Sequence, residues 1–175
     1  MKGHLWLLAL GFACLSACQM AHREQASMKV GDAFVARWAY QGERPEPTTE
    51  KGVASAEVKL GAKFPDSYRA FVKSFGAIES RIELLSHIAD EELDFAEIQE
   101  FFEPEEVVST THDWRGRGLP SEFVAFGSDS MGNLFCFRCV GGACENEVWF
   151  FDHDFEEVET TSLAFSAWLD RFATL

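Results

Sequence analysis

Two short segments of the sequence place a histidine beside carboxylates, a combination that general acid–base catalysis and metal binding both use. They are Asp152-His153-Asp154 and His112-Asp113. On a strand, Asp152 and Asp154 would share one face and His153 would face the other way. No nucleophile or third metal ligand is evident beside either segment. The pattern therefore favours a polar cluster at a strand end and a polar pair on a helix surface, and it predicts a protein that is not an enzyme.

Three of the five cysteines, Cys136, Cys139 and Cys144, have a spacing that suggests a zinc motif. Residues three apart on a strand point to opposite faces, so Cys136 and Cys139 could share a metal only if the strand bulged. A fourth ligand is also missing nearby, and we therefore expect no metal site and no cofactor. Cys139 and Cys144 instead flank a Gly-Gly turn, where facing positions lie about 4.5–5.5 Å apart. We expect these two cysteines to pair as a disulfide in an oxidising compartment.

The charge balance of the chain limits the partners that it can bind. Its 175 residues include 15 basic and 29 acidic ones, which gives a formal net charge of −14. This balance argues against nucleic acid, whose phosphates are attracted by Lys and Arg. It favours encounter with a basic protein. Acidity also keeps proteins soluble, and charge alone favours this interpretation over a role in steering a partner.

Many of the acidic residues lie in one stretch, from Ile88 to Glu106, where apolar residues stand between them. Binding interfaces combine apolar anchors with a charged rim. The alternative is a solvated loop, the default for a run of charges, with some of its aromatics in the core. If the stretch is an interface, the residues expected to bind a partner are Glu97, Glu100, Phe101, Phe102 and Glu103.

Residues 1–18 have the order of a bacterial lipoprotein signal. Lys2 precedes an apolar run that is too short to cross a bilayer as a helix, which needs about twenty residues. The run ends in Leu-Ser-Ala-Cys, which resembles the lipobox, and this resemblance assigns Cys18 the role of the lipidated first residue of the mature protein. We therefore expect a lipoprotein anchored in a membrane on its periplasmic side. If translation starts at Met28 instead, the protein would be cytoplasmic.

The length suits one domain with a short appendage. Residues 19–51 are polar and contain Pro45 and Pro47, which predicts a tether followed by a loosely held leading segment. Three aromatic residues of that segment could dock on the domain: Phe34, Trp38 and Tyr40. The domain itself is expected over residues 52–175.

The apolar pattern of the chain predicts both helices and strands. Helical spacing indicates helices over residues 53–63, 66–76, 104–114 and 162–175. Short runs between turn residues indicate strands over residues 81–87, 123–127, 133–139 and 147–154, of which the last three form an antiparallel meander. Strands bracketed by helices indicate a single α+β domain, a small antiparallel sheet with its flanking helices packed on one side.

Four segments in order carry motifs of one known family. They are LGAKFPDSYRAFVKSFG from Leu60, FGSDSMGN from Phe126, WFFDHD from Trp149 and LAFSAWL from Leu163. In this order they resemble the SUKH superfamily, the Smi–Knr group, and the resemblance covers about residues 52–175. One departure is Arg138, where many relatives carry Asp.

The resemblance implies a SUKH-like fold and a non-catalytic protein-binding domain. The group includes bacterial immunity proteins, so we expect a protein that neutralises a cognate toxin by occluding it, with a basic toxin domain as the partner. The alternative is an envelope scaffold or regulatory lipoprotein that binds a cell-wall or secretion protein. The prolines, glycines and aromatic residues of these motifs suit structural roles within the fold. We therefore expect the residues that determine binding specificity to lie on the solvated surface.

Overall fold

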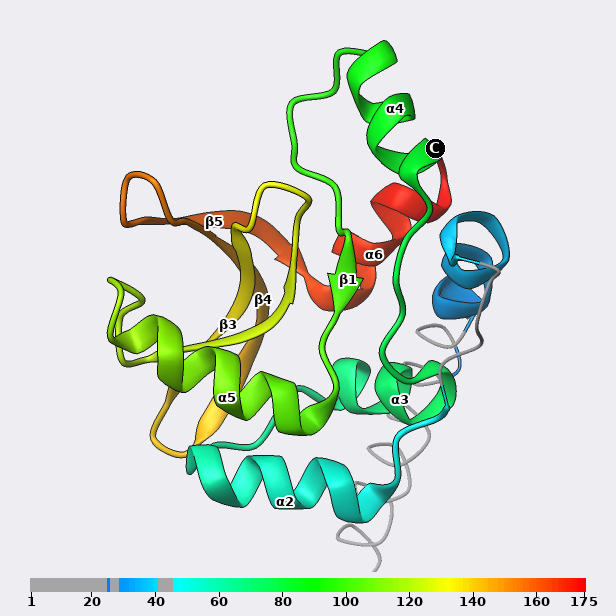
Figure 1. Ribbon diagram of the computed structural model, residues 1–175. Coiled ribbons are helices and arrows are strands. Elements are labelled where there is room, and N and C mark those ends of the chain that lie inside the picture. The colour runs from blue at the N-terminus through cyan, green and yellow to red at the C-terminus, as the bar shows by residue number, and fades with distance from the viewer. Residues whose placement is uncertain (1–24, 26–28, 41–45) are drawn as a thin grey trace, which may run out of the picture.

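The computed structural model of the chain describes residue 25, residues 29–40 and residues 46–175 (Figure 1). The expected signal over residues 1–18, including Cys18, lies outside the described residues, and so does Met28. Residues 29–38 are helical. The elements that follow are α2 (Glu50–Leu60), α3 (Asp66–Phe75), α4 (Ile82–Asp90), β1 (Glu100–Phe101), α5 (Pro104–Arg115), β2 (Phe123–Ser128), β3 (Leu134–Val140), β4 (Ala143–Asp152), β5 (Glu157–Ala164) and α6 (Phe165–Ala173).

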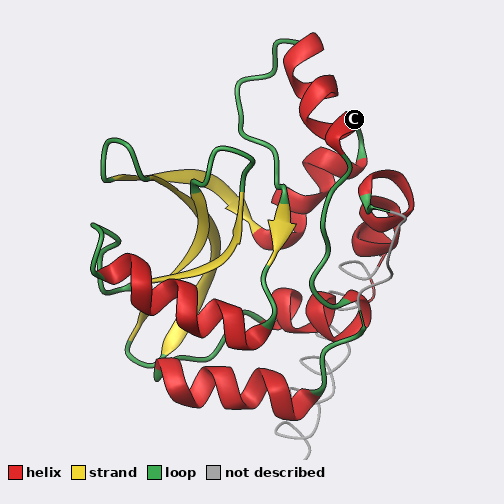
Figure 2. Ribbon diagram, viewed as in Figure 1, coloured by secondary structure: helices red, strands yellow, loops and turns green. Residues whose placement is uncertain are grey.

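The strands of the described residues form one antiparallel sheet in the order β1-β2-β3-β4-β5, so each strand pairs with its neighbours in the sequence (Figure 2). Antiparallel neighbours need only a tight connection. Between β2 and β3, the carboxylate of Asp129 accepts hydrogen bonds from the backbone N–H groups of Met131 and Asn133, at 2.9 and 2.8 Å. The predicted meander of β2, β3 and β4 is confirmed, and β1 and β5 extend it by one strand on each side.

Helices cover both faces of the sheet (Figure 1). On one face, Phe126 and Phe137 stack with ring centroids 4.3 Å apart, and both contact Phe165 of α6. On the other face, Trp114 of α5 lies 5.9 Å from Phe151 of β4. The expectation that the helices pack on one side only is therefore wrong. The physical reason is that β2 is apolar on both faces, and all of its residues are buried.

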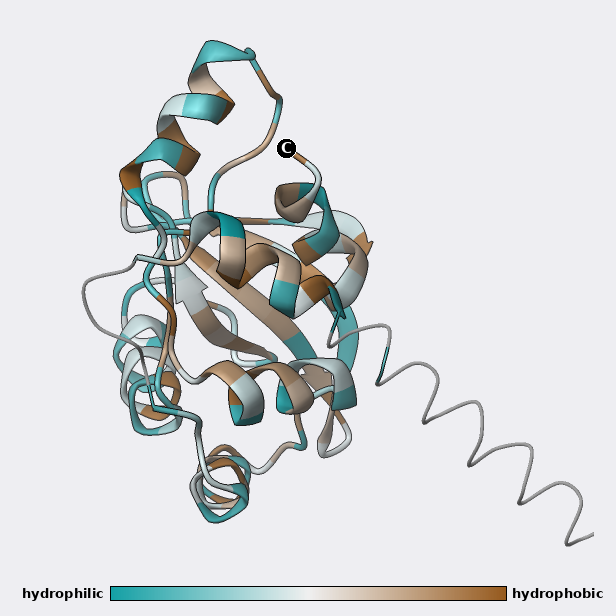
Figure 3. Ribbon diagram, turned by 90° about the vertical axis from the view of Figure 1, so that its right-hand side faces the viewer, coloured by the Kyte–Doolittle hydropathy of each residue, from teal (hydrophilic) through white to brown (hydrophobic). Residues whose placement is uncertain are grey.

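The core between the sheet and the pair α3 and α6 is aromatic. The ring of Tyr68, on α3, lies 5.4 Å from Phe126, 5.2 Å from Phe137 and 5.5 Å from Phe165. Trp168 of α6 adds a contact of 4.9 Å to a further ring, that of Phe135. Figure 3 shows hydrophobic residues along the sheet and on the sides of the helices that face it. Such ring pairs stabilise a core beyond the area that they bury.

Residues 81–87, expected as a strand, belong to a helix. The segment alternates over only a few residues, but Leu84 and Ile88 of α4 are the two buried residues and stand four apart, which is helical spacing. The first turn is closed by a hydrogen bond from the Leu84 N–H to the Arg81 carbonyl at 3.0 Å. A short alternating run fits the period of a strand and that of a helix equally well. The burial of one helical face, with Leu84 and Ile88, makes this segment a helix.

The helical stretch of residues 29–38 packs into the same core. Phe34 is 0% exposed and contacts Phe101 and Phe172. Trp38 is 5% exposed, and its indole N–H donates a hydrogen bond of 2.6 Å to the Phe172 carbonyl. Tyr40 is exposed, and its backbone N–H donates to the Glu79 carbonyl at 2.7 Å. The packed part of the chain therefore reaches further toward the N-terminus than Gly52.

Candidate protein-binding site

The expected interface residues divide into buried and exposed ones. Phe101 and Phe102 are both buried in the core. Phe101 lies on β1, which pairs with β2, and the backbone N–H of Phe102, just after β1, donates to the Phe126 carbonyl at 2.9 Å. Glu97 is 5% exposed, and its carboxylate accepts a hydrogen bond from the Ser130 N–H at 2.9 Å. These three residues hold the fold together and are not open to a partner. Interleaved acidic and aromatic residues give the same sequence pattern in an interface and at a buried sheet edge. The prediction that Glu97, Phe101 and Phe102 lie in an interface is therefore wrong, because all three are buried.

The other two expected residues, Glu100 on β1 and Glu103 before α5, form a cluster of carboxylates with Glu106 in the first turn of α5. We name Glu100, Glu103 and Glu106 the α5 acidic cluster. Pro104 fixes the first turn of the helix and Glu103 is its N-cap residue, a position where the helix dipole favours negative charge. Glu100 is half-buried and accepts a hydrogen bond from the Ser128 hydroxyl at 2.9 Å. Glu106 was not singled out from the sequence, although its place three residues after the N-cap could have indicated it.

Ionisation of Glu106, one of the three carboxyl groups of this cluster, is disfavoured in the free protein. Partial removal from water raises the pKa of Glu106 above its ordinary value, and the charge of Glu100 raises it further. A hydrogen bond from the Glu103 N–H lowers this pKa, whereas the Glu103 carboxylate raises it. Among the described residues, no ion pair involves Glu100, Glu103 or Glu106. The cluster therefore holds like charges that a cationic group would relieve.

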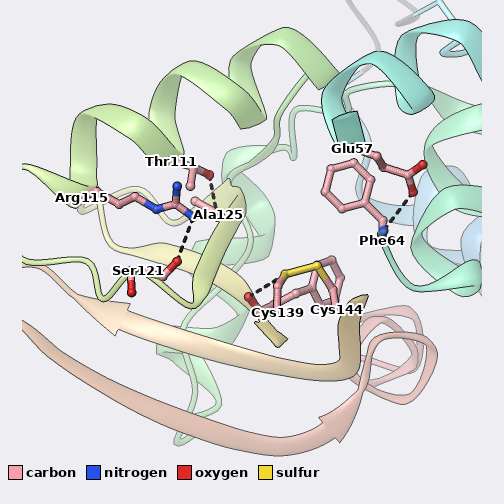
Figure 4. Close-up of a disulfide and its surroundings, with 9 residues drawn as sticks. Glu57, Phe64, Thr111, Arg115, Ser121, Ala125, Cys139 and Cys144 are labelled. Atoms are coloured by element: carbon pink, nitrogen blue, oxygen red, sulfur yellow. Dashed lines mark hydrogen bonds between the residues drawn. A yellow bond between two sulfur atoms is a disulfide. The ribbon is translucent and has the colours of Figure 1, made fainter. Parts of the chain in front are cut away.

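Other acidic residues of the neighbouring helices are already neutralised. Arg69 of α3 binds both Glu50 and Glu57 of α2, and Lys73 lies 2.8 Å from Glu50. The Glu57 carboxylate also accepts a hydrogen bond from the Phe64 N–H at 2.9 Å (Figure 4). These carboxylates join α2 to α3, which distinguishes them from the α5 acidic cluster.

Of the residues that first suggested catalysis, His112 and Asp113 are exposed on α5, whereas Asp152 and His153 hold turns. The side-chain oxygen of Asn133 lies 2.9 Å from Nδ1 of His153, and the same oxygen accepts a hydrogen bond from the His153 backbone N–H. Asp152 accepts hydrogen bonds from the backbone N–H groups of Asp154 and Phe155. Within the described part of the chain, no group of three or more His, Cys, Asp or Glu residues is arranged to hold a metal ion.

Cys139 and Cys144 face each other across the β3–β4 hairpin and are joined in a disulfide (Figure 4). Their hairpin docks on the loop after α2: the Lys63 N–H donates to the Gly142 carbonyl at 3.0 Å, and the Cys144 N–H donates to the Lys63 carbonyl at 2.8 Å. β3 does bulge between Phe137 and Cys139. Cys136 is nevertheless fully buried, and its burial raises the pKa of its thiol.

These features define a class of protein: an α+β domain built on an antiparallel meander, with polar motifs that hold its turns and an acidic surface beside one helix. The chain belongs to the SMI1/KNR4 family, SUKH-1, whose sequence profile matches residues 47–171. The predicted family and fold class are thereby confirmed. A search of curated proteins found no match to this chain. In the described residues, no helix has the length and apolar character needed to cross a membrane.

Proposed function

We propose that this protein is a non-catalytic protein-binding domain, an immunity protein that neutralises a cognate toxin by occluding it, and that the toxin domain is basic. Membership of the SUKH-1 family supports the binding role. The observation that carries the choice of partner is the α5 acidic cluster, whose like charges have no ion-pair partner among the described residues.

A basic partner would bind this surface more tightly and associate with it faster than a neutral one. A lysine or arginine placed among Glu100, Glu103 and Glu106 would replace repulsion by attraction and lower the pKa of Glu106 again. The net charge of −14 adds a long-range field that steers a positively charged protein toward its target. The same field repels the phosphates of nucleic acid, so nucleic acid is not a partner in this proposal.

We further propose that Cys18 carries a lipid and that the domain stands on the periplasmic side of a membrane, joined to it by a tether. A toxin met during entry, or one that acts on the envelope, suits this location. Intact mass spectrometry of the protein purified from its host tests the proposal. A diacylglycerol mass at Cys18 that is lost in Cys18→Ser supports it, and a mature chain that begins at Met28 refutes it in favour of a cytoplasmic protein.

The experiment that tests the function is affinity capture from the native host with the tagged full chain as bait, at low and high salt. The variant Glu100→Gln/Glu103→Gln/Glu106→Gln removes the charges of the cluster and keeps hydrogen-bond acceptors. A matched control, Glu83→Gln/Glu91→Gln/Glu92→Gln, removes as many exposed charges from α4 and the turn after it. We expect wild type to capture a stoichiometric basic protein at low salt and to lose it at high salt. The cluster variant should fail to capture this protein, and the control variant should capture it as wild type does.

Toxicity completes that test. The captured protein should inhibit growth when it is produced alone, and co-production of this chain should restore growth. If the captured proteins belong instead to cell-wall synthesis or secretion and none is toxic, the immunity function is refuted and the alternative, an envelope scaffold or regulatory lipoprotein, takes its place.

A further inference from the structure

Three connections of the fold meet at one end of the sheet. The turn between β2 and β3 touches the end of β4 through the contact of 2.9 Å between Asn133 and His153. The ring of Trp114, near the end of α5, lies 5.6 Å from the His153 ring. The loop after α5 approaches the turn between β4 and β5 so closely that a Cβ atom on Gly118 would lie 2.9 Å from the Glu156 side chain. Segments far apart in the sequence thus form one continuous surface.

Two large apolar side chains stand out from this surface. Met131 and Phe155 are each 74% exposed, and each lies two residues away from one end of the Asn133–His153 contact. Exposed apolar residues that occur singly need no explanation. These two flank the Asn133–His153 contact in the sequence, and the partly exposed ring of Trp114 lies beside the His153 ring, so apolar groups gather at this end of the sheet as anchors do in a binding surface.

The backbone that carries the two anchors is fixed in advance. Asp129 accepts hydrogen bonds from the Met131 and Asn133 N–H groups, and Asp152 accepts one from the Phe155 N–H at 3.3 Å. A surface whose turns are already held loses less conformational freedom when it binds a partner than a flexible loop would.

The charges around the anchors select the partner. Exposed carboxylates flank Phe155 on both sides in the sequence, and another precedes Trp114: Asp113, Asp154, Glu156 and Glu157. The basic groups at this end are Arg117, which lies over the Trp114 ring at 5.5 Å, Arg115, which donates a hydrogen bond to the Ser121 carbonyl at 2.9 Å, and the imidazoles of His112 and His153. A second copy of the chain, or an anionic membrane, would meet repulsion here. A segment that carries basic side chains would not.

We propose that this turn surface, made of Trp114, Met131, His153 and Phe155 with the acidic rim named above, binds a polypeptide segment that combines basic side chains with a large apolar one. The proposal rests on the protein-binding function proposed above and adds where the apolar contacts are made. The turn surface lies at the opposite end of α5 from the α5 acidic cluster, and α5 has 12 residues, which is about 18 Å. One partner of ordinary size can cover both ends, since standard interfaces bury about 800 Å² on each side.

A defined probe tests the turn surface without the native partner. The probe is a fluorescent twelve-residue peptide of alternating Arg and Leu, titrated into the full chain and followed by fluorescence anisotropy. Met131→Ser/Phe155→Ser should weaken binding about tenfold, which is a loss of about 1.4 kcal/mol for the two anchors together. Val58→Ser, on α2 and 82% exposed, is the matched control and should leave the affinity unchanged. A peptide of alternating Arg and Ser should bind wild type and the double variant equally weakly.

Equal affinity of wild type and the double variant for the Arg–Leu peptide would overturn the proposal. So would a loss of affinity in Val58→Ser as large as in the double variant, or equal affinity of wild type for the two peptides. Thermal unfolding of each variant checks that the fold is kept. The capture and growth tests of the immunity function do not use this probe, so either proposal can fail while the other stands.

Discussion

At the scale of single residues, the sequence identifies the chemistry of a side chain better than its surroundings. Phe101 and Phe102 were expected in an interface and lie in the core, because an aromatic residue suits both places equally well. Cys139 and Cys144 could be placed opposite each other, because a two-glycine turn fixes the register of the hairpin around it. Residue identity is therefore informative where the local backbone fixes geometry, and ambiguous where tertiary packing decides.

Phe126 illustrates the energetic weight of the aromatic core. It is fully buried, and its ring contacts rings from α3, β1, β3 and α6. Phe126→Ala should lower the free energy of unfolding by about 3–5 kcal/mol, because it leaves a cavity among these rings. Urea unfolding followed by tryptophan fluorescence measures this loss. The control Phe155→Ala removes an exposed ring and should change stability by less than about 0.5 kcal/mol. Equal effects of the two substitutions would contradict the arrangement of the core.

The carboxylates of Glu50 and Glu106 should respond to pH in opposite ways. The hydrogen bond from Lys73, followed by the charges of Arg69 and Lys73, lowers the pKa of Glu50, whereas partial burial and the charge of Glu100 raise that of Glu106. A lowered pKa contributes stability above the unfolded value that is lost as pH falls through the folded value. A raised pKa contributes stability below the unfolded value that is lost as pH rises through the folded value.

Glu50→Gln should therefore be less stable than wild type at pH 7, and Glu106→Gln more stable. The Glu106→Gln difference should shrink as the pH falls through the raised pKa, above the ordinary glutamate value of about 4.3, and the Glu50→Gln difference only as the pH falls below that value. Glutamine keeps the acceptor for the Glu103 N–H, so the second substitution removes charge alone. Urea unfolding between pH 3 and pH 7.5 gives both curves. A Glu106→Gln variant that is no more stable than wild type at pH 7 would show that the charge of Glu106 is not disfavoured in the cluster.

At the scale of elements, the sequence predicts the helices and strands whose apolar pattern is bounded by turn or cap residues. β2, β3 and β4 are apolar runs between Gly, Asn and Asp turns, and α3 has a clean apolar stripe that ends at Gly76. β5 could not be recognised, because its sequence EVETTSLA is mostly polar and only the neighbouring β4 makes it a strand. β1 has two residues and no pattern of its own. Tertiary pairing creates both of these strands.

The contribution of the disulfide in the β3–β4 hairpin to stability can be tested directly. The Cys139–Cys144 bond closes a short loop and holds the turn that docks on Lys63. Cys139→Ser/Cys144→Ser should reduce the free energy of unfolding by about 2 kcal/mol, the loop-closure entropy of a six-residue ring. Urea unfolding should show the same loss when wild type is reduced with dithiothreitol, and the double variant should not respond to the reductant. If dithiothreitol left the free energy of unfolding of wild type unchanged, the thiols of Cys139 and Cys144 would be free.

At the scale of the whole molecule, the family profile and the packed chain do not begin at the same place. The profile matches from residue 47, but the helical stretch of residues 29–38 supplies Phe34 and Trp38 to the core. The sequence predicted a loosely held segment whose aromatics Phe34, Trp38 and Tyr40 could dock on the domain. Phe34 and Trp38 are buried in the core and Tyr40 is exposed, so the segment is packed more firmly than its polar neighbours and two prolines indicated. The indole of Trp38 also binds the backbone of α6, so the stretch links the start of the chain to its last helix.

A chain that begins at Gly52 should therefore lose most of its stability. Removal of the buried rings of Phe34 and Trp38 costs about 3–5 kcal/mol each, and a whole domain is stable by only about 5–15 kcal/mol. A chain that begins at Met28 keeps residues 29–40 and 46–175 and should unfold at the same urea concentration as the full chain, which would make both proposed translation starts compatible with a folded domain. Trp38→Phe in the full chain separates the hydrogen bond to Phe172 from the burial of the ring and should cost about 1 kcal/mol. Circular dichroism and urea unfolding of the four proteins measure these differences. If the Gly52 form were as stable as the full chain, residues 29–38 would be an attachment to the domain rather than a part of its core.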